Sequence, residues 1–420
     1  MLEEISVDDP GGYGHLSPEY SDFNSYDTLR QEILDDSMED SYSDPLEDKL
    51  AELETRRQLA IDAALSWDHN GIATRLDRVA ASGRAVRPMP DTTVTPPMDF
   101  TLPKLGKIRK LAQGSAIRMA LARDAGEWDQ YVRSFEHIMA LGRVEMQQSS
   151  PIDRLVGLVV RALGFSKLTA DITEGRIPAE TLVKIQGAMD RQSAAPPMSY
   201  AMENEKLFDL DMVQWLYSSH GRLIVSRLNK YFGYNSPSNP IVNVASVVYP
   251  RKAATEQWFD SYYKDMRSWV DLPPATRSKT NPAVDIENLS WRYPIQYVIL
   301  PAIGKLNSSD DQHIQTEIGV RAIIAIARFK ADTGELPDSL SDLIPTYLDT
   351  LPVDWYSENL KPLKYKILEQ PDEYGRTYLL YTVGGDHTDN GGLSSGPAPW
   401  GSGGKNVGYD VILNHPDLDR

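Results

Sequence analysis

The sequence predicts a mainly α-helical protein with a small α+β module at its C-terminal end. Apolar residues recur every three or four positions over residues 104–306, which is typical of helices with one buried face. Segments with β-propensity follow in the C-terminal part, at residues 363–368 and 377–383. We expect the helical part to form a bundle or an irregular solenoid of helix hairpins. The predicted divisions are an acidic tail (1–48), a helix with a proline-rich connector (49–103), the helical domain (104–306) and the α+β module (307–420).

The N-terminal tail is the source of most of the chain's acidity. Residues 1–50 hold 15 acidic and 2 basic side chains, so they contribute −13 of the net charge of −17. Acidic segments without apolar periodicity are typical of disordered or loosely attached arms. The remaining 370 residues carry only −4. This near balance argues against nucleic acid as a partner, because phosphate binding needs a clustered excess of Lys and Arg.

Other features of the composition restrict the chemistry and the location. The chain has no cysteine, which excludes disulfides, thiol catalysis and Cys-ligated zinc. No apolar run reaches the roughly 18–20 residues of a membrane-spanning helix, and the N-terminus lacks the pattern of a signal peptide. Membrane association would therefore need an anchor outside this sequence. The predicted location is the cell envelope or periplasm if such an anchor was removed, and the cytoplasm if Met1 is the native start.

Two helices are predicted before the helical domain. The first covers residues 47–67, with Leu53, Leu59 and Ala63 near one face, and a shorter helix covers residues 72–79. No helix can persist through the five prolines that follow within sixteen residues. These prolines are Pro88, Pro90, Pro96, Pro97 and Pro103.

The helical domain is predicted to begin with a helix pair. Its first helix starts at Lys104, a break falls at residues 124–126, and the second has an apolar stripe that starts at Trp128. The pair resembles one hairpin of the tetratricopeptide kind, although no 34-residue repeat follows. Further helices are predicted over residues 151–168, 178–191, 202–219, 253–270 and 295–306.

The C-terminal module has residues that typically end a helix, followed by a pattern typical of a β-hairpin. The polar residues 307–311 are expected to interrupt the helix, which then ends at Gly334 with Pro337 beyond it. A short helix to Ile344 should follow. Strands are predicted over residues 363–368, 377–383 and 409–413, which gives a helix with a small antiparallel sheet.

Several motif steps follow one another in this module. They are Gly334-x-x-Pro337-x-x-Leu340-x-x-Leu343, Leu351-Pro352-x-Asp354, a tyrosine-rich strand that ends in Gly385-Asp386, and the closing step Asp410-Val411-Ile412. This order resembles the C-terminal part of the major pseudopilin of type II secretion. The whole chain also resembles a group of large envelope proteins of planctomycete bacteria. A pseudopilin's leader and apolar N-terminal helix are missing here, so we expect the module to serve as a folded cap on a helical body.

The loop after the tyrosine-rich strand is the candidate metal site. Asp386, Thr388 and Asn390 alternate before Gly391, like the opening of a calcium loop, although position twelve is Pro397. In the major pseudopilin the corresponding loop binds calcium, which implies carboxylates from the loop and the closing strand. The alternative is an acidic surface loop without an ion. The predicted ligands are Asp386, Thr388, Asp389, Asn390 and Asp410.

None of the motifs tested predicts a catalytic residue. Gly392-Leu-Ser-Ser-Gly396 fits the nucleophile pattern Gly-x-Ser-x-Gly, but it lacks the strand before it and the helix after it. Glu203 and Glu205 could act as an acid–base pair, or complement the dipole of a helix that starts there. The aromatic residues of the helical domain could line a groove, or pack in the core. These aromatic residues are Trp215, Trp258, Trp269, Tyr262 and Tyr263.

The sequence therefore favours a non-catalytic protein over an enzyme. We predict a structural or protein-interaction protein of the cell envelope, whose partners are other proteins or further copies of the chain. The alternative is a hydrolase that acts on an envelope glycan through Asp and Glu side chains in a helical groove.

Overall fold

The computed structural model describes residues 46–84, 102–148, 150–193, 195–232, 249–280, 294–394 and 408–415. Within them the chain is mainly helical with one small three-stranded antiparallel sheet, as predicted. The predicted acidic tail and proline-rich connector lie almost entirely outside the described residues. No helix in the described ranges combines the length and the apolar character needed to span a membrane.

The N-terminal helices are α2 (Leu46–Ser66), α3 (Ile72–Ala81) and α4 (Leu102–Ala125). Helix α2 packs on α4, where the Arg118 guanidinium donates to the Ala64 carbonyl at 2.8 Å. The buried face of α2 differs from the predicted one in one position, because Leu59 is 47% exposed. Small residues form that face instead and allow a close approach to α4. They are Ala60, Ala63 and Ala64, followed by Trp67.

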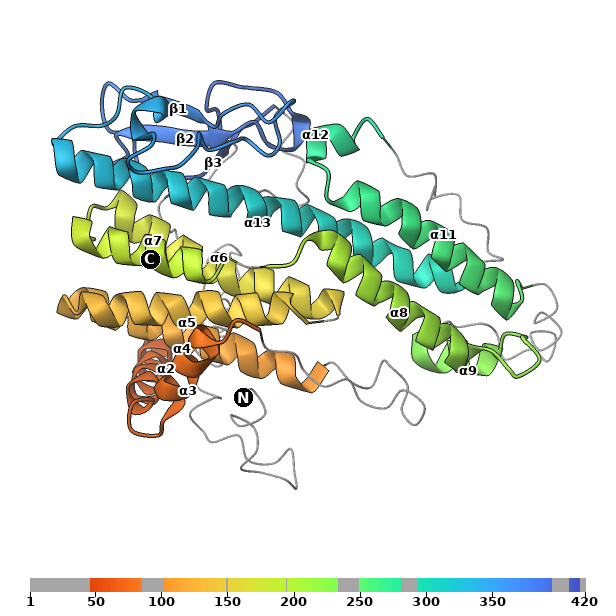
Figure 1. Ribbon diagram of the computed structural model, residues 1–420. Coiled ribbons are helices and arrows are strands. Elements are labelled where there is room, and N and C mark those ends of the chain that lie inside the picture. The colour runs from red at the N-terminus through yellow and green to blue at the C-terminus, as the bar shows by residue number, and fades with distance from the viewer. Residues whose placement is uncertain are drawn as a thin grey trace.

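Three helices form the middle layers of Figure 1, namely α5 (Trp128–Met146), α6 (Pro151–Thr173) and α7 (Ala179–Arg191). The predicted pair of α4 and α5 is confirmed, with the break at Gly126, which adopts φ +72°. Glycines bring α5 and α6 together. A Cβ atom on Gly157 would lie 2.6 Å from the Gly142 carbonyl oxygen, so neither helix could keep this distance with alanine there.

A second group of helices lies beside the N-terminal half of α13 in Figure 1. It consists of α8 (Met198–Leu216), α9 (Val225–Phe232), α11 (Lys252–Val270) and α12 (Pro274–Arg277). Helices α8 and α11 pack side by side around a core of their own. We name this group the α8–α11 lobe. The short helices α9 and α12 were not predicted.

The longest helix, α13 (Pro294–Thr333), connects all these parts. The predicted interruption at residues 307–311 is wrong, because the helix continues through them for a total of 40 residues. The predicted domain boundary at 306/307 therefore falls inside α13. The helix packs on α6 and α7 on one side and contacts the sheet on the other. It ends as predicted at Gly334, whose φ of +83° breaks the helix.

The described residues of the C-terminal module form two short 3-10 helices and three strands, and the three predicted strands are confirmed. The elements are η3 (Leu340–Leu343), β1 (Lys364–Ile367), β2 (Tyr378–Thr382), η4 (Gly384–Asp386) and β3 (Val411–Ile412). Strand β2 lies in the middle, with Tyr365 opposite Leu380 and Thr382 opposite Val411. The module sits closely on α13, because a Cβ atom on Gly319 would come within 2.9 Å of the Leu413 side chain.

Candidate functional site

The predicted calcium ligands lie on one loop after β2 and on the residue before β3. The buried Asp410 carboxylate accepts backbone N–H groups from Asn390 at 3.0 Å and from Gly392 at 2.7 Å. Asp386 accepts the Gly408 N–H at 2.7 Å and the Thr388 N–H at 3.0 Å. The two aspartates therefore hold the two ends of the loop together.

The third aspartate of the loop faces a cation. The Asp389 carboxylate lies 2.7 Å from the Lys364 ammonium of β1, which lowers the pKa of Asp389. Burial raises the pKa of Asp410, and the charges of Asp389 and Asp386 add to this effect while the backbone N–H groups oppose it. The three carboxylates thus interact electrostatically. The pKa of Asp410 is raised in part because negative charge accumulates here.

The other two predicted ligands make local contacts. The Thr388 hydroxyl donates to the Asp386 carbonyl at 3.2 Å, and the Asn390 side-chain amide donates to the Thr388 carbonyl at 3.4 Å. Across the described ranges no three His, Asp or Glu side chains lie close enough together to hold a metal ion. Residues 395–407, which follow the loop, are outside these ranges. Calcium binding by this loop stays a prediction.

A buried carboxylate fixes the base of the same loop. Asp354 accepts hydrogen bonds from the Thr382 hydroxyl at 2.5 Å and from the Val383 N–H at 3.0 Å. Burial raises the pKa of Asp354, and these hydrogen bonds oppose the rise. The His387 ring is hydrogen-bonded to the Tyr356 carbonyl at 2.7 Å. The Leu-Pro-x-Asp step of the sequence therefore connects the start of the module to the end of β2.

The most highly charged buried site was not predicted. It lies on the middle of α13, where four polar residues face arginines or tryptophan from other elements. We name it the α13 polar layer. Its members are Asp310, Asp311, Gln315 and Glu317 of α13, Arg154 and Arg161 of α6, Arg277 of α12 and Trp355 of the C-terminal module.

Each acid of the α13 polar layer is paired across elements. Arg154 lies 2.6 Å from Asp310, and both side chains are buried. Arg161 lies 2.8 Å from Glu317. Asp311 accepts hydrogen bonds from Arg277 and, at 2.9 Å, from the Trp355 indole N–H. Helix α6, helix α12 and the module therefore all bind α13 through its polar residues.

Burial determines the protonation of these groups. It raises the pKa of Asp311 to about 6, and the Arg277 charge opposes the rise. It lowers the pKa of His313, whose ring stacks on Phe165 at 5.7 Å between centroids, so the imidazole is neutral at pH 7. It also lowers the pKa of Arg161, against the attraction of Glu317. Because Asp311 is only 5% exposed, the layer can join elements but cannot meet a substrate without opening.

A sequence pattern could have indicated this layer. Arg154 and Arg161 stand seven residues apart on an otherwise apolar helical segment, so they lie on the same side of α6. Arginines that face inward need carboxylates opposite them. Asp310 supplies one for Arg154 and Glu317 supplies one for Arg161, so the polar residues 307–311 indicate a buried stretch of helix rather than a break.

The predicted acid pair of α8 is arranged differently from the expectation. Glu203 lies on the surface, 2.9 Å from Arg267 of α11. Glu205 lies one turn before Asp209, which is fully buried and accepts the Tyr263 hydroxyl at 2.5 Å. We name Glu205 and Asp209 the α8 acid pair. Burial raises the pKa of Glu205 to about 7, and burial with the neighbouring Glu205 charge raises that of Asp209 well above its usual range.

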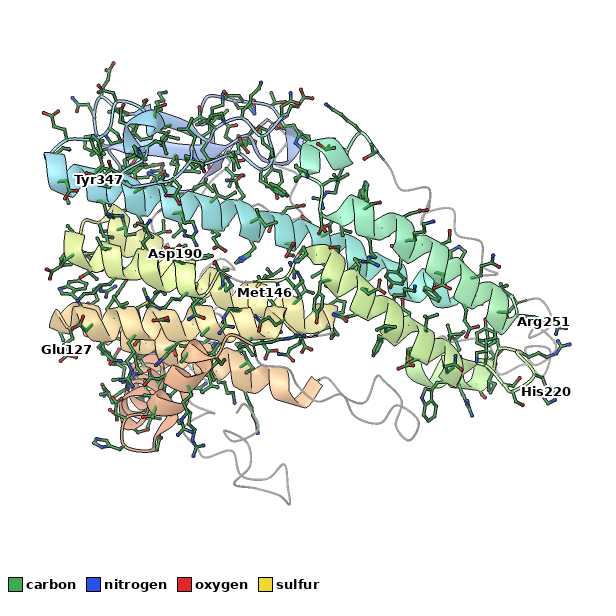
Figure 2. The ribbon with its side chains drawn as sticks, viewed as in Figure 1. Glu127, Met146, Asp190, His220, Arg251 and Tyr347 are labelled. Atoms are coloured by element: carbon green, nitrogen blue, oxygen red, sulfur yellow. The ribbon has the colours of Figure 1, made fainter. Side chains whose placement is uncertain are left out.

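The packing of the α8–α11 lobe shows whether its aromatic residues line a groove or lie in the core. Tyr262 and Tyr263 are buried core residues, and Trp258 stacks on Tyr262 at 5.2 Å. A groove runs between α8 and α11. It lies away from the end of the lobe at which Figure 2 labels His220 and Arg251. Two ion pairs cross it, from Arg267 to Glu203 and, at 2.8 Å, from Lys206 to Asp260. The groove is lined by Ser199, Glu203, Lys206, Asp260, Lys264, Arg267 and Ser268.

Comparison with known proteins gives this geometry no relative. No protein-family model, no curated protein and no solved structure matches the chain.

Proposed function

We propose that this chain is a non-catalytic structural or protein-interaction protein of the cell envelope. The α13 polar layer is the observation that supports it most. Its buried acids bind Arg154, Arg277 and Trp355, which come from three different parts of the chain. Breaking a buried ion pair is costly. The helical body therefore holds the C-terminal module in a fixed position, as a scaffold would.

We also propose that the module is pseudopilin-like. The motif residues have structural roles that fit such a unit. Gly334 ends the long helix, and Leu340 and Leu343 are buried below the sheet. Asp354 and Asp410 both hold the loop that follows β2. These roles support the resemblance residue by residue.

The partners in this proposal are other proteins or further copies of the chain. Leu393 is 57% exposed and its carbonyl accepts the Asp410 N–H, so it lies beside the 38% exposed Tyr409. Adjacent exposed apolar side chains favour protein contacts.

Light scattering of the full chain and fractionation of its source cells test this proposal. We expect assemblies larger than a monomer and recovery with the envelope. The purified chain should release no reducing ends from envelope glycans. A monomer that hydrolyses such a glycan would contradict the proposal.

The module is also proposed to bind Ca²⁺ through the loop that begins at Asp386. Titration calorimetry of the full chain tests this, with Asp386→Ala and, as a control, Asp338→Ala, which changes an exposed aspartate elsewhere in the module. We expect heat from the wild type and from the control, and none from Asp386→Ala. Absence of heat from the wild type would contradict calcium binding while leaving the scaffold proposal intact.

A glycan hydrolase is the second candidate, and the groove between α8 and α11 favours it. Glu203 and Asp260 stand on opposite sides of that groove. Hydrolysis that is lost in Glu203→Gln and retained in Asp265→Asn, an exposed control on α11, would support this candidate.

A further inference from the structure

Helix α4 has an uneven distribution of paired charges. It contains no acidic residue before Asp124. In its C-terminal half the cations are paired, since Arg118 lies 2.6 Å from Asp68 and Arg123 lies 2.9 Å from Asp171. Its N-terminal half is also basic, with Lys107, Arg109 and Lys110. We name these three residues the α4 basic face.

The α4 basic face is accessible and has no counterion within the described ranges. Arg109 is exposed, Lys107 and Lys110 are partly exposed, and the intervening Ile108 is buried. None of the three makes an ion pair with any residue whose side chain the structure describes, although α2 contacts α4 and contains Glu52 and Glu54. These two glutamates pair within α2, Glu52 with Arg56 and Glu54 with Arg57. The α4 basic face is therefore open to an acidic partner from outside these helices.

The chain has a matching anion. Residues 1–45 contain 13 acidic side chains and one basic side chain, Arg30. This segment joins the fold at Leu46, the first residue of α2, and α2 packs on α4. A random coil of 45 residues has an end-to-end distance of about 40 Å. The path along α2 to Ala64 and back along α4 to Arg109 is of similar length, roughly 40 Å at 1.5 Å per residue.

We propose that the α4 basic face is the docking site of the chain's own acidic tail, residues 1–45. Tethering gives such a tail an effective concentration in the millimolar range, so weak ion pairs suffice to hold it. The tail then also blocks this face against other acidic partners, which would have to displace it.

Zero-length carbodiimide cross-linking of the full chain tests this proposal, because it joins a lysine amine only to a carboxylate in contact with it. The products are mapped by mass spectrometry in the monomer fraction. We expect tail cross-links to Lys107 and Lys110, and few to Lys330 and Lys361, which are exposed lysines that have no ion-pair partner in the described structure. In 1 M salt, where charges are screened beyond about 3 Å, the specific cross-links should disappear.

A charge-reversal variant provides the matched comparison. In Arg109→Glu with Lys110→Glu, tail cross-links to Lys107 should fall about tenfold, because two surface attractions become repulsions. Lys361→Glu should leave them unchanged. Circular dichroism checks that the variants stay folded. Cross-links confined to covalent dimers would identify a second copy as the occupant and overturn the proposal. An even distribution over all exposed lysines, or no tail cross-links, would overturn it as well.

Discussion

The α13 polar layer and the α8 acid pair both bury carboxyl groups, but only in the α13 polar layer do arginines lie beside these groups. Asp310 and Asp311 face Arg154 and Arg277. Asp209 accepts the Tyr263 hydroxyl, and neither Glu205 nor Asp209 makes an ion pair with any described residue. An acid that is buried with an arginine joins two elements and stays charged. A buried acid without an arginine partner avoids the cost of an unpaired buried charge only while it is protonated.

Removing one arginine is the strongest test of this difference. In Arg154→Leu the Asp310 carboxylate stays buried without a partner, and we expect a loss of about 3–5 kcal/mol in the free energy of unfolding. Urea unfolding followed by circular dichroism at pH 7 measures it. The double variant Arg154→Leu with Asp310→Leu should recover most of the loss, because no buried charge is then left unpaired. A loss below about 1 kcal/mol would mean that the pair behaves like an exposed one.

The α8 acid pair should show its character in the pH dependence of stability. The folded pKa of Glu205 is about 7 and its ordinary value is 4.5, so the folded state binds more protons than the unfolded state between these values. The free energy of unfolding should therefore fall as the pH rises through this interval. The expected fall is roughly 2–3 kcal/mol between about pH 5 and pH 8.

Variants assign this fall to the α8 acid pair. Glu205→Gln with Asp209→Asn should remove the larger part of it, since neither amide releases a proton, and should leave only the share of Asp311 below pH 7. Asp260→Asn, a substitution in the nearby groove, should leave it in place. If the fall is undiminished in the double variant, other groups are responsible and the α8 acid pair is not the unpaired site described above.

Sequence periodicity predicted the helices and strands well because their apolar faces repeat locally. It placed the C-terminal strands and the end of α13 at Gly334 correctly. It failed at residues 307–311, where the polarity suggested a break. The arginines that stabilise this stretch belong to α6 and α12, more than 30 residues away.

The sequence predicted the loop after β2 as a candidate site, but it did not predict the α8 acid pair. The loop from Asp386 to Gly392 was recognised because its residues are adjacent in sequence. The α8 acid pair was missed because Glu203 and Glu205 were considered as neighbours. On a helix, side chains four residues apart lie on one face, so Glu205 belongs with Asp209. Burial, which gives both groups their raised pKa, depends on Tyr263 of α11 and has no local pattern.

A single substitution in the α13 polar layer gives the smallest and most selective effect. Asp311→Asn keeps an acceptor for the Trp355 indole and removes the charge opposite Arg277. We expect a loss of about 1–2 kcal/mol at pH 7 in the urea experiment. In the folded protein the pKa of Asp311 is about 6, so Asp311 is largely ionised by pH 7. It therefore contributes little to the change in stability above pH 7. The fall in stability above pH 7 should therefore be the same in this variant as in the wild type. A flatter curve above pH 7 in Asp311→Asn would instead assign the titrating group to the α13 polar layer, and the two sites would then not differ in the way their partners suggest.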